Sequence, residues 1–169
     1  MSLFPRSAIS HWILSILAVS WIGSGCVNPE SGPRQPIAFS HKIHAGQNRI
    51  ACQYCHGGVR RAAAAGIPSE RLCMGCHKLV AATRPEIVRL RTMFENKEPI
   101  RWYKVNDIPE FVYFNHYPHI ARGIECRKCH GDIQTMTEVH PVVNLADMAF
   151  CVGCHRQHQA SVDCYTCHR

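Results

Sequence analysis

One short motif occurs five times in this sequence and constrains its fold more than any other feature. Each copy is Cys-x-x-Cys followed at once by His, and ten of the eleven cysteines belong to these copies. The copies, called sites 1 to 5 below, are Cys52-Cys55-His56, Cys73-Cys76-His77, Cys126-Cys129-His130, Cys151-Cys154-His155 and Cys164-Cys167-His168. This is the attachment motif of c-type haem: two thiols on one turn reach one edge of the porphyrin, and the next imidazole lies under the iron as proximal ligand. The sequence therefore predicts five c-type haems.

Two other uses of ten cysteines compete with this interpretation. The spacing between the first two pairs, from Cys55 to Cys73, also suits a zinc ribbon. Ten thiols could alternatively form five disulfides in an exported domain. Neither alternative requires a histidine after every second cysteine, so we favour haem.

The first 27 residues read as an export signal or a membrane anchor. A start containing Arg6 precedes the apolar stretch Ile9 to Ile22. The stretch could nearly span a bilayer, although Gly23-Ser-Gly-Cys26 resembles a lipoprotein cleavage box with Cys26 as the acylated residue. Both modes of anchoring stay open. In either case we expect a cell-membrane tether with the haem domain on the periplasmic, extracytoplasmic side, where c-type haem is attached.

The rest of the chain contains an internal repeat. A Phe-x-His-x-x-His sequence precedes site 1 and again precedes site 3; box 1 is Phe39 to His44 and box 2 is Phe114 to His119. Each box is followed by two haem motifs. The predicted organisation is 28–38 as a Pro/Gly tether, 39–82 as diheme module 1, 83–113 as a haem-free connector, 114–158 as diheme module 2 and 159–169 as the fifth site. In the connector, we expect a short helix from Pro85 to Phe94 and an extended stretch from Pro99 to Phe114.

Each iron of a low-spin electron carrier needs a second axial ligand, which His or Met supplies. The two boxes provide four candidates, His41, His44, His116 and His119. Histidines three residues apart share a face of a helical turn, and one iron has room for one further ligand, so the two members of a box should serve different haems. For the fifth iron the sequence leaves four candidates open, with the first two preferred: His140, Met148, Met136 and His158.

Five haems in so short a chain must form much of the hydrophobic core themselves and lie close together. We therefore predict a mostly α-helical and irregular multihaem cytochrome in which neighbouring haems permit electron hopping. The formal charge of +7 is largely counter-charge for haem propionates. It gives no support for nucleic-acid binding.

The paired boxes and attachment motifs resemble the small class III multihaem cytochromes. The layout from Phe39 to Arg169 is similar to the pentahaem cytochrome c subunit of alternative complex III, a bacterial quinol-oxidising assembly. The resemblance implies a non-enzymatic electron-transfer subunit. Its expected partners are an iron–sulfur subunit, quinone-binding membrane subunits and a monohaem cytochrome c, a copper protein or a terminal oxidase. It also implies that His41 ligates the His56 haem and His116 the His130 haem, with the second histidine of each box serving a more distant haem.

Two other functions stay open. A stand-alone membrane-tethered cytochrome would carry the same motifs outside any complex. A multihaem enzyme of the nitrite or hydroxylamine type would need one iron with an open position, whereas every motif here ends in His and enough distal candidates exist to close all five sites.

Overall fold

The computed structural model describes residues 32–141 and 145–169, and its regular structure is helical throughout. Three short non-α helices are η1 (Lys42–Gln47, a π-helix), η2 (Gly57–Arg60) and η3 (Ile133–Thr135), the last two being 3-10 helices. The α-helices are α1 (Cys52–Cys55), α2 (Glu70–His77), α3 (Pro85–Glu95), α4 (His116–Ala121), α5 (Arg127–His130), α6 (Met148–Gln157) and α7 (Cys164–Cys167). The described chain contains no strand, and Val112 and His168 form an isolated bridge. This agrees with the predicted mostly helical and irregular fold.

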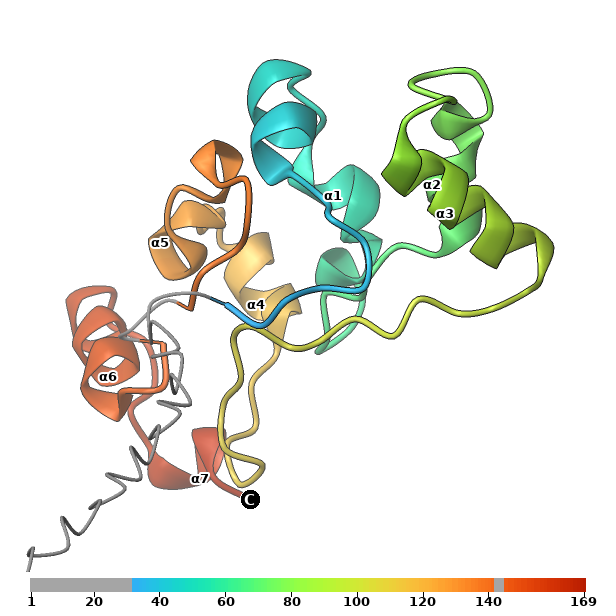
Figure 1. The fold of residues 1–169 in the computed structure, drawn as a ribbon. Helices are drawn as coiled ribbons and strands as arrows, with labels where there is room; N and C mark the ends of the chain where they lie inside the picture. Colours follow the sequence, from blue (N-terminus) through green and yellow to red (C-terminus); the bar gives the residue numbers. More distant parts are fainter. Residues whose placement is uncertain (1–31, 142–144) are drawn as a thin grey trace, which may run out of the picture.

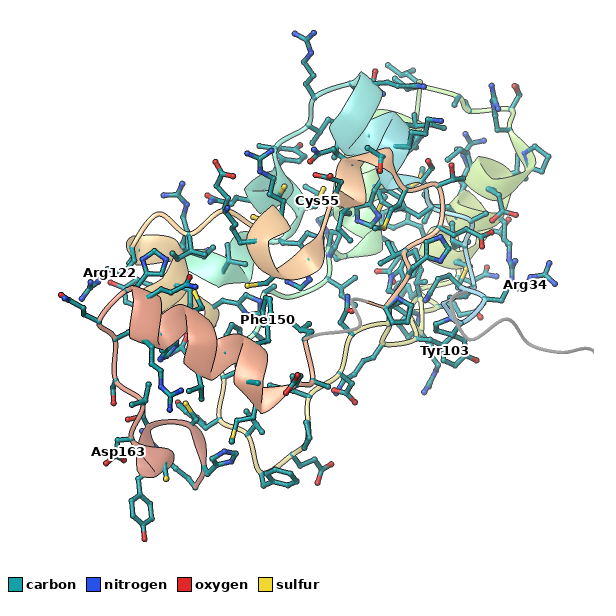
Figure 2. The ribbon with its side chains drawn as sticks, turned by 90° about the vertical axis from the view of Figure 1, so that its left-hand side faces the viewer. Arg34, Cys55, Tyr103, Arg122, Phe150 and Asp163 are labelled. Atoms are coloured by element: carbon teal, nitrogen blue, oxygen red, sulfur yellow. The ribbon has the colours of Figure 1, made fainter. Side chains whose placement is uncertain are left out.

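The helices are arranged along an arc rather than around a common centre. Figure 1 shows α2 and α3 at one end, α1, α4 and α5 in the middle, and α6 and α7 at the other end. Figure 2 shows the molecule from the α6–α7 side, with Asp163 at the lower left, Phe150 and Cys55 near the middle, and Arg34 and Tyr103 on the right. The molecule is therefore extended, and its parts contact mainly their neighbours along the arc.

Two expectations about the connector can be compared with the structure. The predicted helix from Pro85 to Phe94 is confirmed as α3, which begins with Pro85 at its first turn, where proline is well tolerated. The following stretch, residues 99–114, has no regular structure. It is held to the rest of the chain by single contacts, such as the Tyr103 amide donating to Gln35 Oε1 at 3.0 Å.

The membrane anchor predicted for residues 1–27 lies outside the described residues, as does Cys26. Within the described ranges, no helix has the length and apolar character needed to cross a bilayer.

Very little of the polypeptide is buried by the polypeptide itself. The described hydrophobic side chains that are buried are Ile37, Val59, Met74 and Leu90. A domain of this length normally buries about two thirds of the surface of its unfolded chain. Protein side chains therefore supply only a small fraction of a conventional core.

Both boxes fold as helical turns with capped starts. Box 1 forms η1, where Ser40 Oγ accepts from the Ile43 amide at 3.3 Å. Box 2 forms α4, where Asn115 Oδ1 accepts from the Tyr117 amide at 3.0 Å. Ser and Asn are favoured before a helix because their side-chain oxygens satisfy amides that lack intrahelical partners.

The two boxes also contact each other's modules. The Lys42 amide of box 1 donates to the Met136 carbonyl, just after η3, at 2.8 Å. The His116 amide of box 2 donates to the Ala63 carbonyl, just after η2, at 3.1 Å. Each box therefore packs on the loop that follows the first site of the opposite module.

Candidate haem sites

All five Cys-x-x-Cys-His motifs lie on helical turns, in α1, α2, α5, α6 and α7 or at their ends. A helical turn brings both cysteines of a pair to neighbouring positions and points the following histidine back across the turn. The ten motif cysteines are free thiols. The structure thus offers five pairs of unbridged thiols, which does not favour the disulfide alternative.

The first histidine of each box lies opposite the proximal histidine of the nearest site. The rings of His41 and His56 have centroids 6.4 Å apart and planes only 9° apart. The rings of His116 and His130 have centroids 6.3 Å apart and planes 7° apart. The two modules therefore repeat the same nearly parallel arrangement at sites 1 and 3, which we call the inner sites.

The second histidine of each box lies opposite the histidine of the next site along the chain. His44 and His77 have ring centroids 5.9 Å apart with planes at 64°. His119 and His155 have centroids 6.0 Å apart with planes at 43°. Sites 2 and 4, called the outer sites, thus pair their imidazoles at a wide angle, and the two histidines of each box face different sites.

The spacing within these pairs fits a metal between the rings. Two imidazoles bonded to opposite sides of one metal ion, each through a metal–nitrogen bond of about 2 Å, have centroids roughly 6 Å apart. Aromatic rings in direct contact cover a wider range of centroid distances, about 4.5–7 Å, whereas each of these four pairs joins a box histidine to the histidine of an attachment motif. No group of three or more His, Cys, Asp or Glu side chains able to hold a metal ion occurs among the described residues. The geometry therefore suits one planar iron group per ring pair better than a zinc cluster.

Hydrogen bonds fix the orientation of most of these rings. Nδ1 of six histidines donates to a backbone carbonyl: His44 to Ser40 (2.8 Å), His56 to Gly66 (2.7 Å), His77 to Val80 (3.0 Å), His116 to Ala63 (2.7 Å), His119 to Asn115 (2.8 Å) and His155 to Ser161 (2.6 Å). A proton held on Nδ1 leaves Nε2 with a free lone pair, the usual arrangement of a metal-ligating histidine. Of the two paired histidines without such a bond, His41 and His130, His41 has an Nδ1 atom that is buried without a partner in the described chain.

These acceptors are functional groups that sequence reasoning missed. Ser40 and Asn115 precede their histidines by four residues, so the helical pattern of the boxes could have revealed them. The loop carbonyls of Ala63, Gly66 and Val80 depend on the path of the backbone, and no sequence signal identifies them.

Burial keeps two of the paired histidines neutral. Burial, with smaller contributions from the nearby rings of His56 and His44, lowers the pKa of His41 from 6.5 to about 4. Burial also lowers the pKa of His130, with smaller contributions from His116 and His56. The neutral imidazole is the form that binds metals. Because the His56 ring of site 1 contributes to the lowered pKa of His130 in site 3, the two inner sites lie close together.

The thiols of neighbouring sites influence one another. Burial is the main cause of a raised pKa at Cys55, Cys73, Cys126, Cys129 and Cys151. In four cases the charge of a cysteine in another site raises the pKa further. These cases are Cys73, raised by Cys55; Cys126, raised by Cys52; Cys129, raised by Cys151; and Cys151, raised by Cys167.

The phenylalanine of each box contacts both of its histidines. Phe39 lies 4.9 Å from His41 and 4.3 Å from His44, measured between ring centroids. Phe114 lies 4.8 Å from His116 and 4.9 Å from His119. These contacts give the phenylalanine of each box a physical role, because its ring holds the two imidazoles apart and directed at different sites.

Site 5 is different. The ring contact of His168 is with Phe111, at 5.9 Å. Among the described residues, neither His140 nor His158 pairs with a proximal histidine, and both are exposed. Met148 begins α6 and is 66% exposed, while Met136 is half-buried. The structure thus brings the four box histidines to sites 1 to 4 and leaves the fifth distal ligand without a matching ring.

Comparison with known proteins agrees with this geometry. Residues 112–169, which span box 2 and sites 3 to 5, match the family described as cytochrome c7 and related cytochrome c. This third of the chain is therefore similar to multihaem cytochromes c. Such proteins carry c-type haem, and the paired imidazoles and free thiols described above fit that group.

Two proteins of Nitratidesulfovibrio vulgaris are similar to this chain. The menaquinone reductase multiheme cytochrome c subunit is 33% identical over 101 residues, covering 59% of this chain and 47% of the relative. The high-molecular-weight cytochrome c is 30% identical over 145 residues, covering 70% of this chain and 26% of the relative. The chain thus spans about half of the first relative and about a quarter of the second.

Proposed function

We propose that this cytochrome binds five c-type haems and conducts electrons between a membrane quinone site and a further carrier. The single observation that supports this most strongly is the set of four histidine pairs with ring centroids 5.9–6.4 Å apart. An iron with two histidine ligands has no open position for substrate, so such sites carry electrons rather than transform small molecules. At sites 1 to 4 this argues against the nitrite or hydroxylamine type of enzyme, and at site 5 the same argument depends on the distal ligand proposed below.

The residues divide into three roles. The ten motif cysteines provide the thioether bonds, and His56, His77, His130, His155 and His168 provide the proximal ligands. His41, His44, His116 and His119 provide distal ligands to sites 1 to 4. Either His140 or Met148 provides the fifth. The haem would supply a one-electron iron couple, and the carbonyl acceptors at Nδ1 keep six of these imidazoles in the ligating tautomer.

We further propose that the protein acts as a subunit of a membrane complex related in layout to alternative complex III. The apolar N-terminal segment would tie it to the periplasmic face of the cell membrane. Its partners would be an iron–sulfur subunit, quinone-binding membrane subunits and a monohaem cytochrome c or an oxidase. Support comes from the box and motif layout and from the relative that is itself a subunit of a quinone-linked complex.

The direction of electron flow has a second candidate. The similar protein is named a menaquinone reductase subunit, which favours electrons moving towards quinone. Purification in mild detergent separates the possibilities. A complex that reduces its haems with added menaquinol supports quinol oxidation, and one that oxidises pre-reduced haems with menaquinone supports the reverse. A lone monomer on a native gel would contradict membership of any complex.

The ligand assignment is tested by His44→Ala. We expect all five haems to remain attached, since the cysteines are untouched, and one haem to become high spin. Parallel imidazole planes split the iron d orbitals more than crossed planes do, so His44→Ala should remove a signal of large anisotropy and His41→Ala a rhombic one. Electron paramagnetic resonance with a pyridine haemochrome count measures both effects.

Lys42→Ala is the matched control, because the Lys42 side chain is exposed on the same helical turn and is not a candidate ligand. It should leave every low-spin signal unchanged. Unaltered low-spin signals in His44→Ala would refute the assignment of His44, and fewer than five haems in the unmodified protein would refute the haem count.

A further inference from the structure

The order of the five sites in space is not given by their order in the sequence. A chain that added each site to the end of the last would place the sites in the sequence order 1–2–3–4–5. The contacts between the modules show a different order.

The links within each module come from the boxes. His41 faces site 1 and His44 faces site 2, and both belong to one helical turn with Phe39 against both rings. Box 1 therefore joins sites 1 and 2. Box 2 joins sites 3 and 4 in the same way, through His116 and His119. The sequence order 1–2–3–4–5 also contains these two links, so they do not decide between the orders.

The link between the modules distinguishes the two orders. Box 1 donates from Lys42 to Met136, in the loop after site 3, and a Cβ added at Gly46 of the same turn would collide with the Gln134 carbonyl of η3. Box 2 donates from the His116 amide and Nδ1 to Ala63, in the loop after site 1. Each module thus presents its box to the first site of the other, in a reciprocal, nearly two-fold arrangement.

A reciprocal arrangement places like parts together at its centre. The inner sites 1 and 3 therefore meet in the middle, and the outer sites 2 and 4 lie on opposite sides. The thiols are consistent with this placement, because Cys52 of site 1 is near enough to Cys126 of site 3 to raise the pKa of its thiol. In Figure 1 α2 lies at one end of the arc, while α1 and α5 lie in the middle.

Site 5 continues the series beyond site 4. The Tyr113 amide donates to the Cys167 carbonyl at 2.6 Å, and Val112 bridges to His168, which ties site 5 to the segment entering box 2. On the site 4 side, His155 Nδ1 donates to Ser161, whose hydroxyl lies 3.0 Å from that of Thr166 in α7. Site 5 is thus held at the end of the arc away from site 2.

We propose that the haem sites form one unbranched series in the order 2–1–3–4–5, so that site 2 and site 5 are its two ends and site 1 connects site 2 to everything else. This rests on the proposed binding of five haems and adds their route. Electrons arriving at the α2–α3 end would have to pass site 1, and a partner at the other end would be served through site 5.

A photochemical experiment distinguishes this series from the sequence order. Thr83→Cys places a thiol on the exposed segment after site 2, where a ruthenium photoreductant can be attached in the full-length, detergent-solubilised protein. The flash-induced fast phase of haem reduction is then compared in two four-haem proteins. One lacks site 1 (Cys52→Ala with Cys55→Ala), and its matched control lacks site 5 (Cys164→Ala with Cys167→Ala). Labelling of protein without Thr83→Cys corrects for reaction at Cys26.

Each flash delivers one electron, so the fast phase is summed over repeated flashes with a sacrificial electron donor that regenerates the photoreductant. The series predicts that four electrons enter by the fast phase in the control and one, at the site 2 haem, without site 1, a loss of three quarters of the summed amplitude. A fast phase of equal amplitude in the two proteins would overturn the proposed order, since electrons would then pass directly from site 2 to site 3.

A second measurement needs no haem deletion, in case the variant lacking site 1 does not fold. In the fully reduced unmodified protein, nuclear Overhauser contacts between porphyrin substituents should connect sites 2 and 1, 1 and 3, 3 and 4, and 4 and 5. Contacts between the porphyrins of sites 2 and 3, without contacts between 1 and 3, would overturn the order. A haemochrome count of five alongside a wrong order refutes the series alone, whereas a lower count refutes the proposed haem content.

Discussion

Module 1 and module 2 begin alike and end differently. Their inner sites pair imidazoles at 9° and 7°, and each is held by hydrogen bonds that cross between the modules. Their outer sites pair imidazoles at 64° and 43°, and the distal ring of each is held by a carbonyl of its own helical turn. The inner geometry is therefore set by the association of the modules and the outer geometry by local structure.

The regions after the outer sites differ most. Site 2 lies on α2, which packs against α3, and each of these helices buries one apolar side chain, Met74 at 2% and Leu90 at 3% exposure. Site 4 lies on α6, which continues towards site 5, and neither α6 nor α7 contains a buried residue. The polypeptide thus contributes to its own packing at one end of the arc, while the other end has to be organised around its cofactors.

The largest effect is expected when each outer site is removed in turn, which tests whether the two ends of the arc differ in their own stability. We expect Cys151→Ala with Cys154→Ala to lower the free energy of unfolding of its end of the arc by about 5 kcal/mol or more, since little else holds α6. Cys73→Ala with Cys76→Ala should cost roughly 3 kcal/mol less, because two buried apolar side chains remain. Hydrogen exchange of the amides in α6 and in α2–α3 measures the two local stabilities. Equal loss of protection at the two ends would show that α2–α3 has no stability of its own.

The contrast between the ends also shows what the sequence could reveal. The two boxes predicted that their histidines face different sites, because histidines three residues apart lie on one helical turn. The family resemblance implied the ring pairs of the inner sites, and the partners of His44 and His119 at the outer sites were not predicted. Pro85 and its apolar neighbours predicted α3 for the same local reason. The crossing contacts at Ala63 and Met136 could not be foreseen, since they join backbone groups of segments distant in sequence. Site 5 lacks a box, so neither the motif nor the fold specifies its distal ligand.

The association of the modules can be tested at Gly46. A Cβ at this position would meet the backbone oxygen of Gln134, which cannot move aside as a flexible side chain would. We expect Gly46→Ala to lower the free energy of unfolding by about 1–3 kcal/mol, as overpacking does elsewhere. It should also disturb the parallel ring planes of the inner sites more than the crossed planes of the outer ones. Denaturant unfolding and electron paramagnetic resonance report these effects.

Gln47→Ala is the matched control for Gly46→Ala. Gln47 is the next residue of η1 and is exposed, so alanine there changes the same turn without entering the contact between modules. Its expected cost is within about 0.5 kcal/mol. If the two variants were equally stable, η1 and η3 would not be in the close contact described.

The smallest expected effect concerns the caps of the two boxes. Asn115 Oδ1 accepts from the Tyr117 amide at 3.0 Å, whereas the corresponding bond from the Ile43 amide to Ser40 Oγ is longer, 3.3 Å. Asn115→Ala should therefore cost about 1 kcal/mol of stability, and Ser40→Ala somewhat less. Alanine keeps the backbone carbonyls that accept from His119 and His44, so both variants should retain every low-spin signal. Thermal unfolding followed by the haem absorbance gives the cost, and a change of spin state in either variant would mean that the cap side chain, and not the carbonyl, positions the distal histidine.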